Sequence, residues 1–451
     1  MSKATFDVPL RTLDPCFEGD VPATLCTCAA DGTPNASLLS VVRRVDDEHI
    51  ALSFQYFRKT KQNLKENPKA RLLVIEPRSA AEYRLSLEHL RSETEGESFE
   101  RLAISLSAIA SQTGMEDRFK LRGADIYRVT ACERFDNGIT TRLPAPSPDL
   151  LARLSHCTAS LSSCSDLADL LRIALEELEV TLGQGHSFVM AADEAAGTLF
   201  SIASRGYTPS GIGAELPIGE GVIGMSAARR APLRIASMSR ERIFADAVRS
   251  QGLEDLSAQR TIELPGLPRT ESQLVVPLLA QGQLLGVLCV QSAEPGAFSR
   301  DDEELATVVA HQLASCMARF DESAPTESHE PSTSEMPETV EPTEPRLGIR
   351  HYQEDDSVFV NNEYLIKGVA GCILWLLLCA YKAEGRRQFT NRELRLNPHL
   401  GLPPVKDNLE SRLIMLRERL AERCPQLSMQ RTGRGRFELQ VIAGSLELES
   451  V

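Results

Sequence analysis

The chain has 451 residues, which is enough for about three domains of ordinary size. Hydrophobic residues make up 42% and charged residues 25%, so each domain has enough apolar residues for its own core. A formal net charge of −14 argues against nonspecific binding to nucleic acid or membrane by the chain as a whole. There is no signal-peptide pattern, and the longest apolar run, near 369–381, is shorter than the roughly 20 residues of a bilayer span. We therefore expect a cytoplasmic location and no membrane partner.

The cysteines predict free thiols. There are eleven, an odd number, and they form neither CxxC pairs nor zinc-type spacings. Thiols of this kind are typical of a reducing compartment. We assign no metal site.

Two composition changes divide the chain. Residues 321–345 contain eight acidic residues, five prolines and no Lys or Arg, which predicts a disordered acidic linker over about 321–349. Three prolines between 143 and 148 mark a second boundary. The predicted domains are therefore 1–140, 150–320 and 350–445.

Short strands separated by turn residues dominate the first domain, and this pattern favours a small barrel. A helix is expected at about 60–66, between the third and fourth strands. The expected strands are 23–28, 37–45, 49–54, 71–75, 83–90 and 124–129.

The stretch from Phe57 to Leu64, followed by Asn67-Pro68, resembles the flavin-binding split barrels of the pyridoxamine 5′-phosphate oxidase type. The resemblance implies an FMN cofactor whose phosphate lies at this strand-to-helix corner. A helix N-terminus suits that task because its free N–H groups and positive dipole end attract anions. The cofactor-binding residues implied are Arg58, Lys59, Thr60, Gln62 and Asn63.

The chain also departs from the oxidase. The substrate-binding segment of that enzyme, with its Trp and Arg, has no counterpart before Pro144, which argues against pyridoxamine phosphate oxidation. An empty barrel, or one holding haem or a deazaflavin, stays open, because a fold does not fix a function. The eight scattered His suggest no nucleophile and base pair, so no catalytic residue is assigned.

The middle domain begins with an amphipathic helix or helix pair over 150–179 and ends with a helix over about 303–319. Strands are expected at 187–192 and 199–204, followed by the segment Leu216 to Met225 and two further apolar runs. This series resembles a GAF domain, a small-ligand sensor fold with an antiparallel sheet and packed helices. The resemblance implies a small-molecule ligand without identifying it. In many members the flanking helices pair between subunits, so we expect a homodimer.

Gly219-x-Gly221-x-x-Gly224 also matches a dinucleotide-binding fingerprint. No buried strand leads directly into it, and the motif alone is weak evidence. We interpret the glycines as part of a loop beside the ligand pocket.

The last domain carries a local positive charge. Residues 364–440 contain 14 Lys and Arg against 7 Asp and Glu, a surplus of seven positive charges in an acidic chain. Thr390 and Glu393 form a capping-box pattern that predicts a helix start at Asn391. Asp407 and Glu410 predict a second capped helix that runs to about Arg423. Its core face is Leu409, Leu413, Leu416 and Leu420.

A tight basic turn follows, and the whole arrangement resembles the winged-helix DNA-binding domain of OmpR-type response regulators. The resemblance implies that the third helix enters the major groove and that the hairpin contacts the minor groove or the backbone. Arginine suits both tasks because it pairs with guanine and with phosphate. The DNA-binding residues implied are Asn408, Ser411, Arg412, Met415, Arg419, Arg434 and Arg436. A winged helix that contacts protein is the alternative.

The sequence therefore predicts a multidomain α+β protein built from a split β-barrel, a GAF α/β sensor domain and a winged helix. We expect a sensory transcription regulator that couples small-molecule or redox sensing to DNA binding. Two alternatives stay open. One is an FMN-dependent oxidoreductase with regulatory domains, and the other is a signalling scaffold that binds protein.

Overall fold

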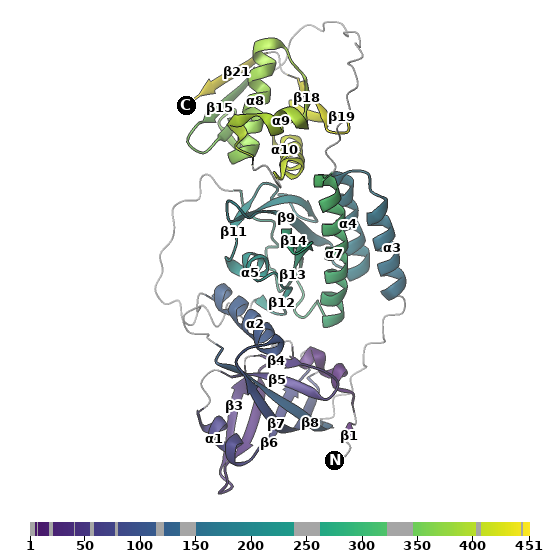
Figure 1. Cartoon of the computed structure of the whole chain (residues 1–451), viewed down its shortest axis with the longest axis vertical. Helices are drawn as coiled ribbons and strands as arrows, with labels where there is room; N and C mark the ends of the chain where they lie inside the picture. Colours follow the sequence, from purple (N-terminus) through teal and green to yellow (C-terminus); the bar gives the residue numbers. More distant parts are fainter. Residues whose placement is uncertain are drawn as a thin grey trace.

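Three units follow one another along the long axis of the molecule in chain order (Figure 1). The computed structural model describes the chain except residues 1–4, 7, 18–20, 40, 55–57, 77–79, 114–120, 136–149, 239–261, 323–345, 403–406 and 443–444. The proline-rich boundary and nearly all of the predicted acidic linker lie outside the described residues. None of the described helices has the length and apolar character that crossing a bilayer requires.

The first unit is a curled, largely antiparallel sheet with the strand order β3-β2-β6-β7-β8-β5-β4, and β1 joins β8 in parallel. The strands are β1 (Thr5–Phe6), β2 (Ala23–Cys28), β3 (Pro34–Leu39), β4 (Val42–Arg44), β5 (His49–Phe54), β6 (Lys69–Ile75), β7 (Glu82–Glu93) and β8 (Gly123–Phe135). The single strand expected over 37–45 is wrong, because the chain forms β3 and β4 at opposite ends of this order. A short 3-10 helix, η1 (Leu10–Phe17), and α1 (Arg58–Glu66) complete the unit.

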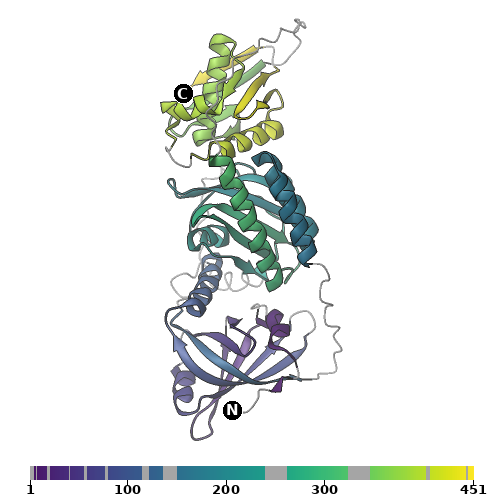
Figure 2. The same cartoon turned by 45° about the vertical axis from the view of Figure 1, so that its right-hand side comes forward.

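Helix α2 (Glu97–Thr113) belongs to the first unit but reaches toward the second (Figure 2). It packs against α5 (Gly221–Arg229) and β12 (Leu233–Ile235) of the second unit. Ile104 of α2 joins the apolar cluster beneath α5. The barrel therefore contacts the α5 side of the central unit directly.

The central unit is an antiparallel sheet with the order β11-β10-β9-β14-β13-β12. Its remaining strands are β9 (His186–Asp193), β10 (Thr198–Arg205), β11 (Glu215–Pro217), β13 (Ser272–Ala280) and β14 (Gln283–Ser292). Helices α3 (Leu150–Ser163), α4 (Leu167–Leu182) and α7 (Arg300–Glu322) cover one face of the sheet, and α5 covers the other (Figure 1). The expected helix over 150–179 is thus a pair. Asp166 caps α4 at its start, and Gly183 ends it with a positive φ of 69°.

The C-terminal unit contains two small sheets. The first has the order β17-β16-β15-β21 and the second β18-β20-β19. Their strands are β15 (Arg346–Tyr352), β16 (Ser357–Val360), β17 (Glu363–Ile366), β18 (Gln388–Thr390), β19 (Leu427–Gly433), β20 (Arg436–Val441) and β21 (Ser445–Ser450). Because β21 pairs in parallel with β15, the unit extends beyond the expected limits of 350 and 445 at both ends.

The helices of this unit are α8 (Gly368–Glu384), α9 (Asn391–Leu396) and α10 (Leu409–Arg423), with a short 3-10 turn at Pro398–Leu400. The capping box at Thr390 and Glu393 is confirmed, and α9 begins at Asn391. The second box is wrong, because Asn408 occupies the N-cap of α10 with a φ of 51° and no side-chain cap bond. Asp407 instead pairs with Arg395, and Glu410 accepts a hydrogen bond from Asn391.

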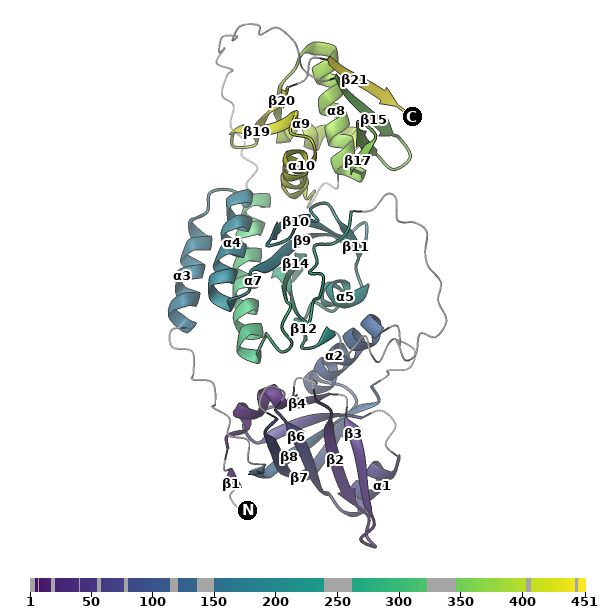
Figure 3. The ribbon, with the colours of Figure 1, turned by 180° about the vertical axis from the view of Figure 1, so that it is seen from behind.

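One apolar cluster continues from the central unit into the C-terminal unit, whereas the barrel has clusters of its own. Seen from behind in Figure 3, α10 lies at the boundary, next to β10 and β9. The C-terminal unit is therefore docked on the central unit through packed side chains.

Candidate functional site

The predicted cofactor residues lie at the strand-to-helix corner of the barrel and form two sets, one facing outward and one facing inward. Lys59 and Gln62 are exposed at the start of α1, where the dipole of the helix favours an anion. The side chain of Arg58 lies outside the described residues. The outward set therefore offers a cation and an amide beside free backbone N–H groups, and these donors fit a phosphate.

The inward set, Thr60 and Asn63, is bonded to the sheet. Thr60 is 3% exposed and lies 2.9 Å from the Ser37 hydroxyl, and its Oγ1 accepts a hydrogen bond of 3.0 Å from Asn35. Asn63 is 2% exposed and donates to the Thr27 hydroxyl at 3.2 Å. These two side chains fasten α1 to β2 and β3, so their position is explained without a ligand.

Polar side chains also line the α5 face of the central sheet, and the sequence analysis missed them. The Tyr207 hydroxyl donates to Gln291 at 3.3 Å, and Gln273 donates to the thiol of Cys289 at 3.1 Å. Both glutamines are buried within otherwise apolar strands, and this exception to the strand pattern is the signal that could have found them. Apolar residues with a few convergent polar groups are typical of a small-molecule site. Burial raises the pKa of Cys289 to about 12, so this thiol stays protonated at neutral pH.

The glycine motif lies beside this face, but only Gly219 precedes α5, whereas Gly221 and Gly224 lie within the helix and not in the expected loop. Gly219 and Gly221 have positive φ values of 101° and 59° in the turn that starts α5. A Cβ on Gly224 would lie 2.5 Å from the Pro217 carbonyl oxygen, so only glycine fits there. Within the described part of the chain, the preceding strand β11 pairs with β10 alone and in an antiparallel arrangement, which does not match a dinucleotide-binding βαβ unit.

The basic hairpin of the C-terminal unit has an exposed tip. Arg434 and Arg436 are both exposed at the turn between β19 and β20. They line a groove of about 1610 Å³ bounded by this hairpin, α9, α10, the start of α4 and the end of α7. Its other arginines are Arg319, Arg392, Arg395, Arg417 and Arg431. Arg395 pairs with Asp407 at 2.5 Å, and Arg431 pairs with Asp166 at 2.9 Å.

The predicted DNA-binding residues of α10 are not free. Asn408 donates a hydrogen bond of 3.0 Å to the Ala192 carbonyl, and Arg412 pairs with Asp193 at 2.5 Å. Met415 is 5% exposed. The predicted DNA contacts of these side chains are not available in this conformation, because the central unit covers them. Burial lowers the pKa of Arg412, and the Asp193 carboxylate partly offsets this.

Ser411 and Arg419 are buried as well, each at about 5% exposure. The Arg419 guanidinium donates from Nε to the Leu365 carbonyl of β17 at 2.9 Å and also pairs with Glu422. Arg419 therefore links α10 to its own unit. Burial lowers its pKa.

A sequence signal for this burial exists. Leu413, Ile414, Met415 and Leu416 are four consecutive apolar residues on one helix, so apolar side chains point to opposite sides of it. A helix that is apolar on opposite sides has a second packing partner.

Two of the three units match known family models. Residues 164–318 match the GAF domain model, and residues 11–130 match the pyridoxamine 5′-phosphate oxidase model. The chain therefore carries a GAF domain and an N-terminal domain of the pyridoxamine 5′-phosphate oxidase type. The winged-helix resemblance of the C-terminal unit stays a prediction. No curated protein matches the chain.

Solved structures with local similarity include the GAF domain of an Acinetobacter phosphoenolpyruvate-protein phosphotransferase. It is 22% identical, with a TM-score of 0.33, over 40% of this chain and 100% of that chain. An FMN-binding protein from Syntrophomonas wolfei is 21% identical, with a TM-score of 0.24, over 29% of this chain and 89% of that chain.

Proposed function

We propose that this chain is a cytoplasmic sensory regulator whose GAF domain binds a small molecule and whose C-terminal unit binds DNA. The observation that carries the DNA proposal is the exposed pair Arg434 and Arg436 at the tip of a hairpin that follows α9 and α10. This order of elements is the one that a winged helix requires. The local surplus of positive charge in an acidic chain supports it.

The groove beside the hairpin supplies the electrostatic argument. Arginine side chains converge on it from α9, α10 and both hairpin strands. A phosphate backbone matches such a surface because each contact releases condensed counterions. Arg434 and Arg436 then hold the backbone, while α10 is the element that reads bases.

The N-terminal domain is proposed to bind FMN. Lys59, Gln62 and the N-terminus of α1 hold the phosphate, while Thr60 and Asn63 keep the helix in place. When bound, FMN supplies redox chemistry, and α2 links this domain to the α5 side of the GAF domain. An absorption scan of the purified protein tests this step, with flavin bands expected and a featureless spectrum counting against it.

DNA binding is tested by the double variant Arg434→Ala with Arg436→Ala. Duplex affinity should fall at low salt, and the slope of log affinity against log salt should decrease by about 2, because two phosphate contacts are lost. The matched control is Arg101→Ala with Arg172→Ala, which removes the same charge from exposed sites on other units. Equal loss in both variants would refute the assignment of the hairpin.

Two other functions have some support. The match to the oxidase model over 11–130 favours a flavin-dependent oxidoreductase, and turnover of NAD(P)H by a yellow protein would establish it. The burial of α10 against the central unit favours a winged helix that binds protein, as in a signalling scaffold. Failure of every duplex to bind at low salt would select this reading.

The proposed assembly is a homodimer formed through the helical layer of the GAF domain. Leu151 is 80% exposed, Val180 69% and Val308 43%, and they lie on α3, α4 and α7. Exposed apolar side chains on a helical layer are suited to pairing with a second copy. Sedimentation equilibrium tests this, and a Leu151→Glu, Val308→Glu variant should be monomeric.

A further inference from the structure

The face of α10 that points away from its own unit is covered by the central unit. Arg412 pairs with Asp193, and its guanidinium lies 5.1 Å from the centre of the Phe200 ring. Asn408 at the start of α10 donates to the Ala192 carbonyl. Asp193 and Ala192 end β9 and Phe200 lies in β10, so α10 contacts the end of one strand hairpin.

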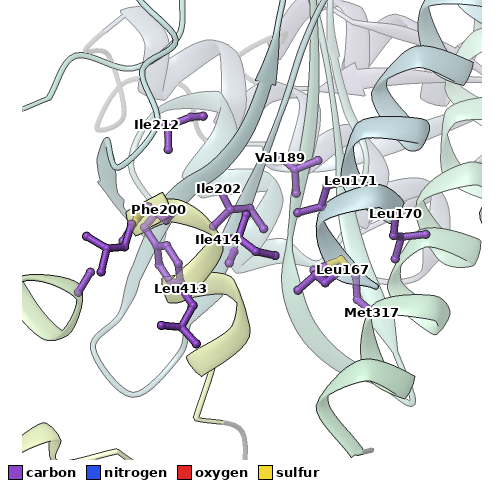
Figure 4. Packing of buried hydrophobic residues seen from close by; sticks show 14 of the residues in the cluster. Leu167, Leu170, Leu171, Val189, Phe200, Ile202, Ile212, Met317, Leu413 and Ile414 are labelled. Atoms are coloured by element: carbon purple, nitrogen blue, oxygen red, sulfur yellow. The ribbon is translucent and has the colours of Figure 1, made fainter. Parts of the chain in front are cut away.

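Apolar packing fills the same interface. Phe200 and Ile212 of the central unit share one cluster with Ile414 and Met415 of α10. Figure 4 shows Leu413 and Ile414 of α10 next to Phe200 and Ile202 of the sheet. The helix lies on the face of the sheet that α4 and α7 also cover, so it extends that helical layer.

Polar contacts fix the rim of the interface. Ser210 donates to Glu422 at 2.7 Å, near the end of α10. Lys367, just before α8, pairs with Glu215 of β11 at 2.9 Å. Arg431 of the hairpin pairs with Asp166, the cap of α4, also at 2.9 Å. The docked arrangement therefore engages both α10 and the hairpin.

Three of the proposed DNA-reading residues lie in the docked interface. Asn408 and Arg412 cannot contact base edges while they bond to the central unit, and Met415 cannot while it is buried. A helix enters the major groove, about 12 Å wide, only with that face free. We propose that docking of α10 on the GAF domain and duplex binding are mutually exclusive, so that the docked arrangement is the DNA-free state. This proposal rests on the proposed DNA binding.

The same strands connect this interface to the ligand side of the sheet. Phe188, Met190 and Leu199 point to the α5 face, whereas Phe200 and Ile202 point to the face that α10 covers. A small molecule on the α5 face contacts strands β9 and β10 from behind. Such a ligand releases α10 to the extent that it binds the undocked state more tightly than the docked state.

A charge-reversal variant on the central unit tests this without touching the DNA-reading residues. Asp193→Lys with Glu215→Lys removes the partners of Arg412 and Lys367 and places like charges against them. Glu194→Lys with Glu220→Lys is the matched control, since both residues are exposed and neither pairs with the C-terminal unit in the described contacts. The control carries the same added charge, so a general gain in attraction to DNA cancels.

Two measurements are made on the full chain. Hydrogen exchange of residues 409–423 reports docking, and fluorescence anisotropy with a labelled random-sequence duplex at low salt reports binding. The expected result is faster exchange and at least tenfold tighter duplex binding in the Asp193→Lys, Glu215→Lys variant than in the control. Faster exchange with unchanged affinity overturns the proposal.

A covalent lock provides a second test that does not depend on folding of the reversed variant. A water-soluble carbodiimide joins Lys367 Nζ to the Glu215 carboxyl as an amide, because the pair is within 2.9 Å, and the lost water converts the reagent to its urea. The treated Lys367→Gln chain cannot form this link and is the control. Duplex present during the reaction should suppress the link, and the linked chain should bind duplex at least tenfold more weakly than the control.

The outcomes separate the two proposals. A linked chain that binds duplex as well as the control overturns mutual exclusion and leaves DNA binding intact. An undocked variant that ignores duplex at low salt overturns DNA binding itself, and mutual exclusion with it.

Discussion

At the residue scale, a polar side chain near a candidate ligand site often has a structural role instead. Thr60 and Asn63 are among the residues expected to bind the cofactor, yet their hydrogen bonds go to Thr27, Asn35 and Ser37. Lys59, one residue earlier, is exposed. Adjacent positions on the same helix thus differ in role, because one side chain holds the fold while its neighbour is exposed to solvent.

Replacing Thr60 with Val should therefore destabilise the barrel. The substitution keeps the shape but removes the buried hydroxyl that bonds Asn35 and Ser37, at a cost of about 1–3 kcal/mol in the free energy of unfolding. Urea denaturation measures this. Lys59→Ala is the control, with an expected change within about 0.5 kcal/mol because the side chain is exposed. Equal effects would contradict the inward role of Thr60.

Glu410 gives a pH-dependent prediction. Burial raises its pKa above the ordinary value, and this outweighs the opposing effect of Arg395 and Arg431. A raised pKa means that the folded state favours the protonated acid. Its stabilising contribution is then full below the unfolded pKa and is lost as pH rises through the folded pKa.

The variant Glu410→Gln, which cannot ionise, should thus gain stability relative to the wild type as pH is raised from 4 to 7. Denaturation midpoints across this range measure the difference. The exposed Glu418→Gln on the same helix is the control. A difference that shrinks with rising pH would show that ionised Glu410 is favoured by its arginine neighbours.

At the element scale, the two predicted capping boxes had different outcomes. Thr390 and Glu393 form the expected reciprocal box, with Thr390 accepting from the Glu393 amide at 3.2 Å. Asp407 has the same pattern but pairs with Arg395, twelve residues earlier. Asp407 also accepts from the Leu409 amide, and Glu393 also pairs with Arg386, so an arginine partner does not by itself decide which cap forms.

Thr390→Ala should destabilise the C-terminal unit by about 1 kcal/mol, because it removes the hydroxyl that caps α9. Trp375, the only tryptophan of the chain, lies in α8 of this unit and stacks on His351, so its fluorescence reports the transition. Thr432→Ala, at an exposed hairpin position, should leave the midpoint unchanged. If Thr390→Ala and Thr432→Ala shifted the unfolding midpoint equally, the Thr390 cap would have no stabilising effect of its own.

At the scale of the whole molecule, the apolar clusters predict which units unfold together. The central and C-terminal units share one cluster, whereas the barrel has its own. Units joined by packed apolar side chains should lose structure in one transition. The barrel, which contacts the central unit mainly through α2, should unfold separately.

Trp375 makes this testable. Leu171→Ala in α4 removes a side chain that is 1% exposed in the central core, and a substitution of this kind costs about 2–5 kcal/mol. It should shift the Trp375 transition although it lies in another unit. Leu72→Ala in the barrel, at 0% exposure, is the matched control and should not shift the Trp375 transition. A Trp375 midpoint insensitive to Leu171→Ala would show that the two units unfold independently.

The sequence alone determined the elements whose signals are local. Strand alternation, the glycine turn before α5, the capping box of α9 and the basic hairpin required only neighbouring residues, and the barrel and GAF resemblances rested on such runs. Tertiary structure decided what each element packs against. It separated β3 from β4, turned Thr60 inward and covered the second side of α10 with β9 and β10. Periodicity shows that a helix side is apolar, but the surface that buries it comes from residues about 200 positions away, whose approach only the folded chain reveals.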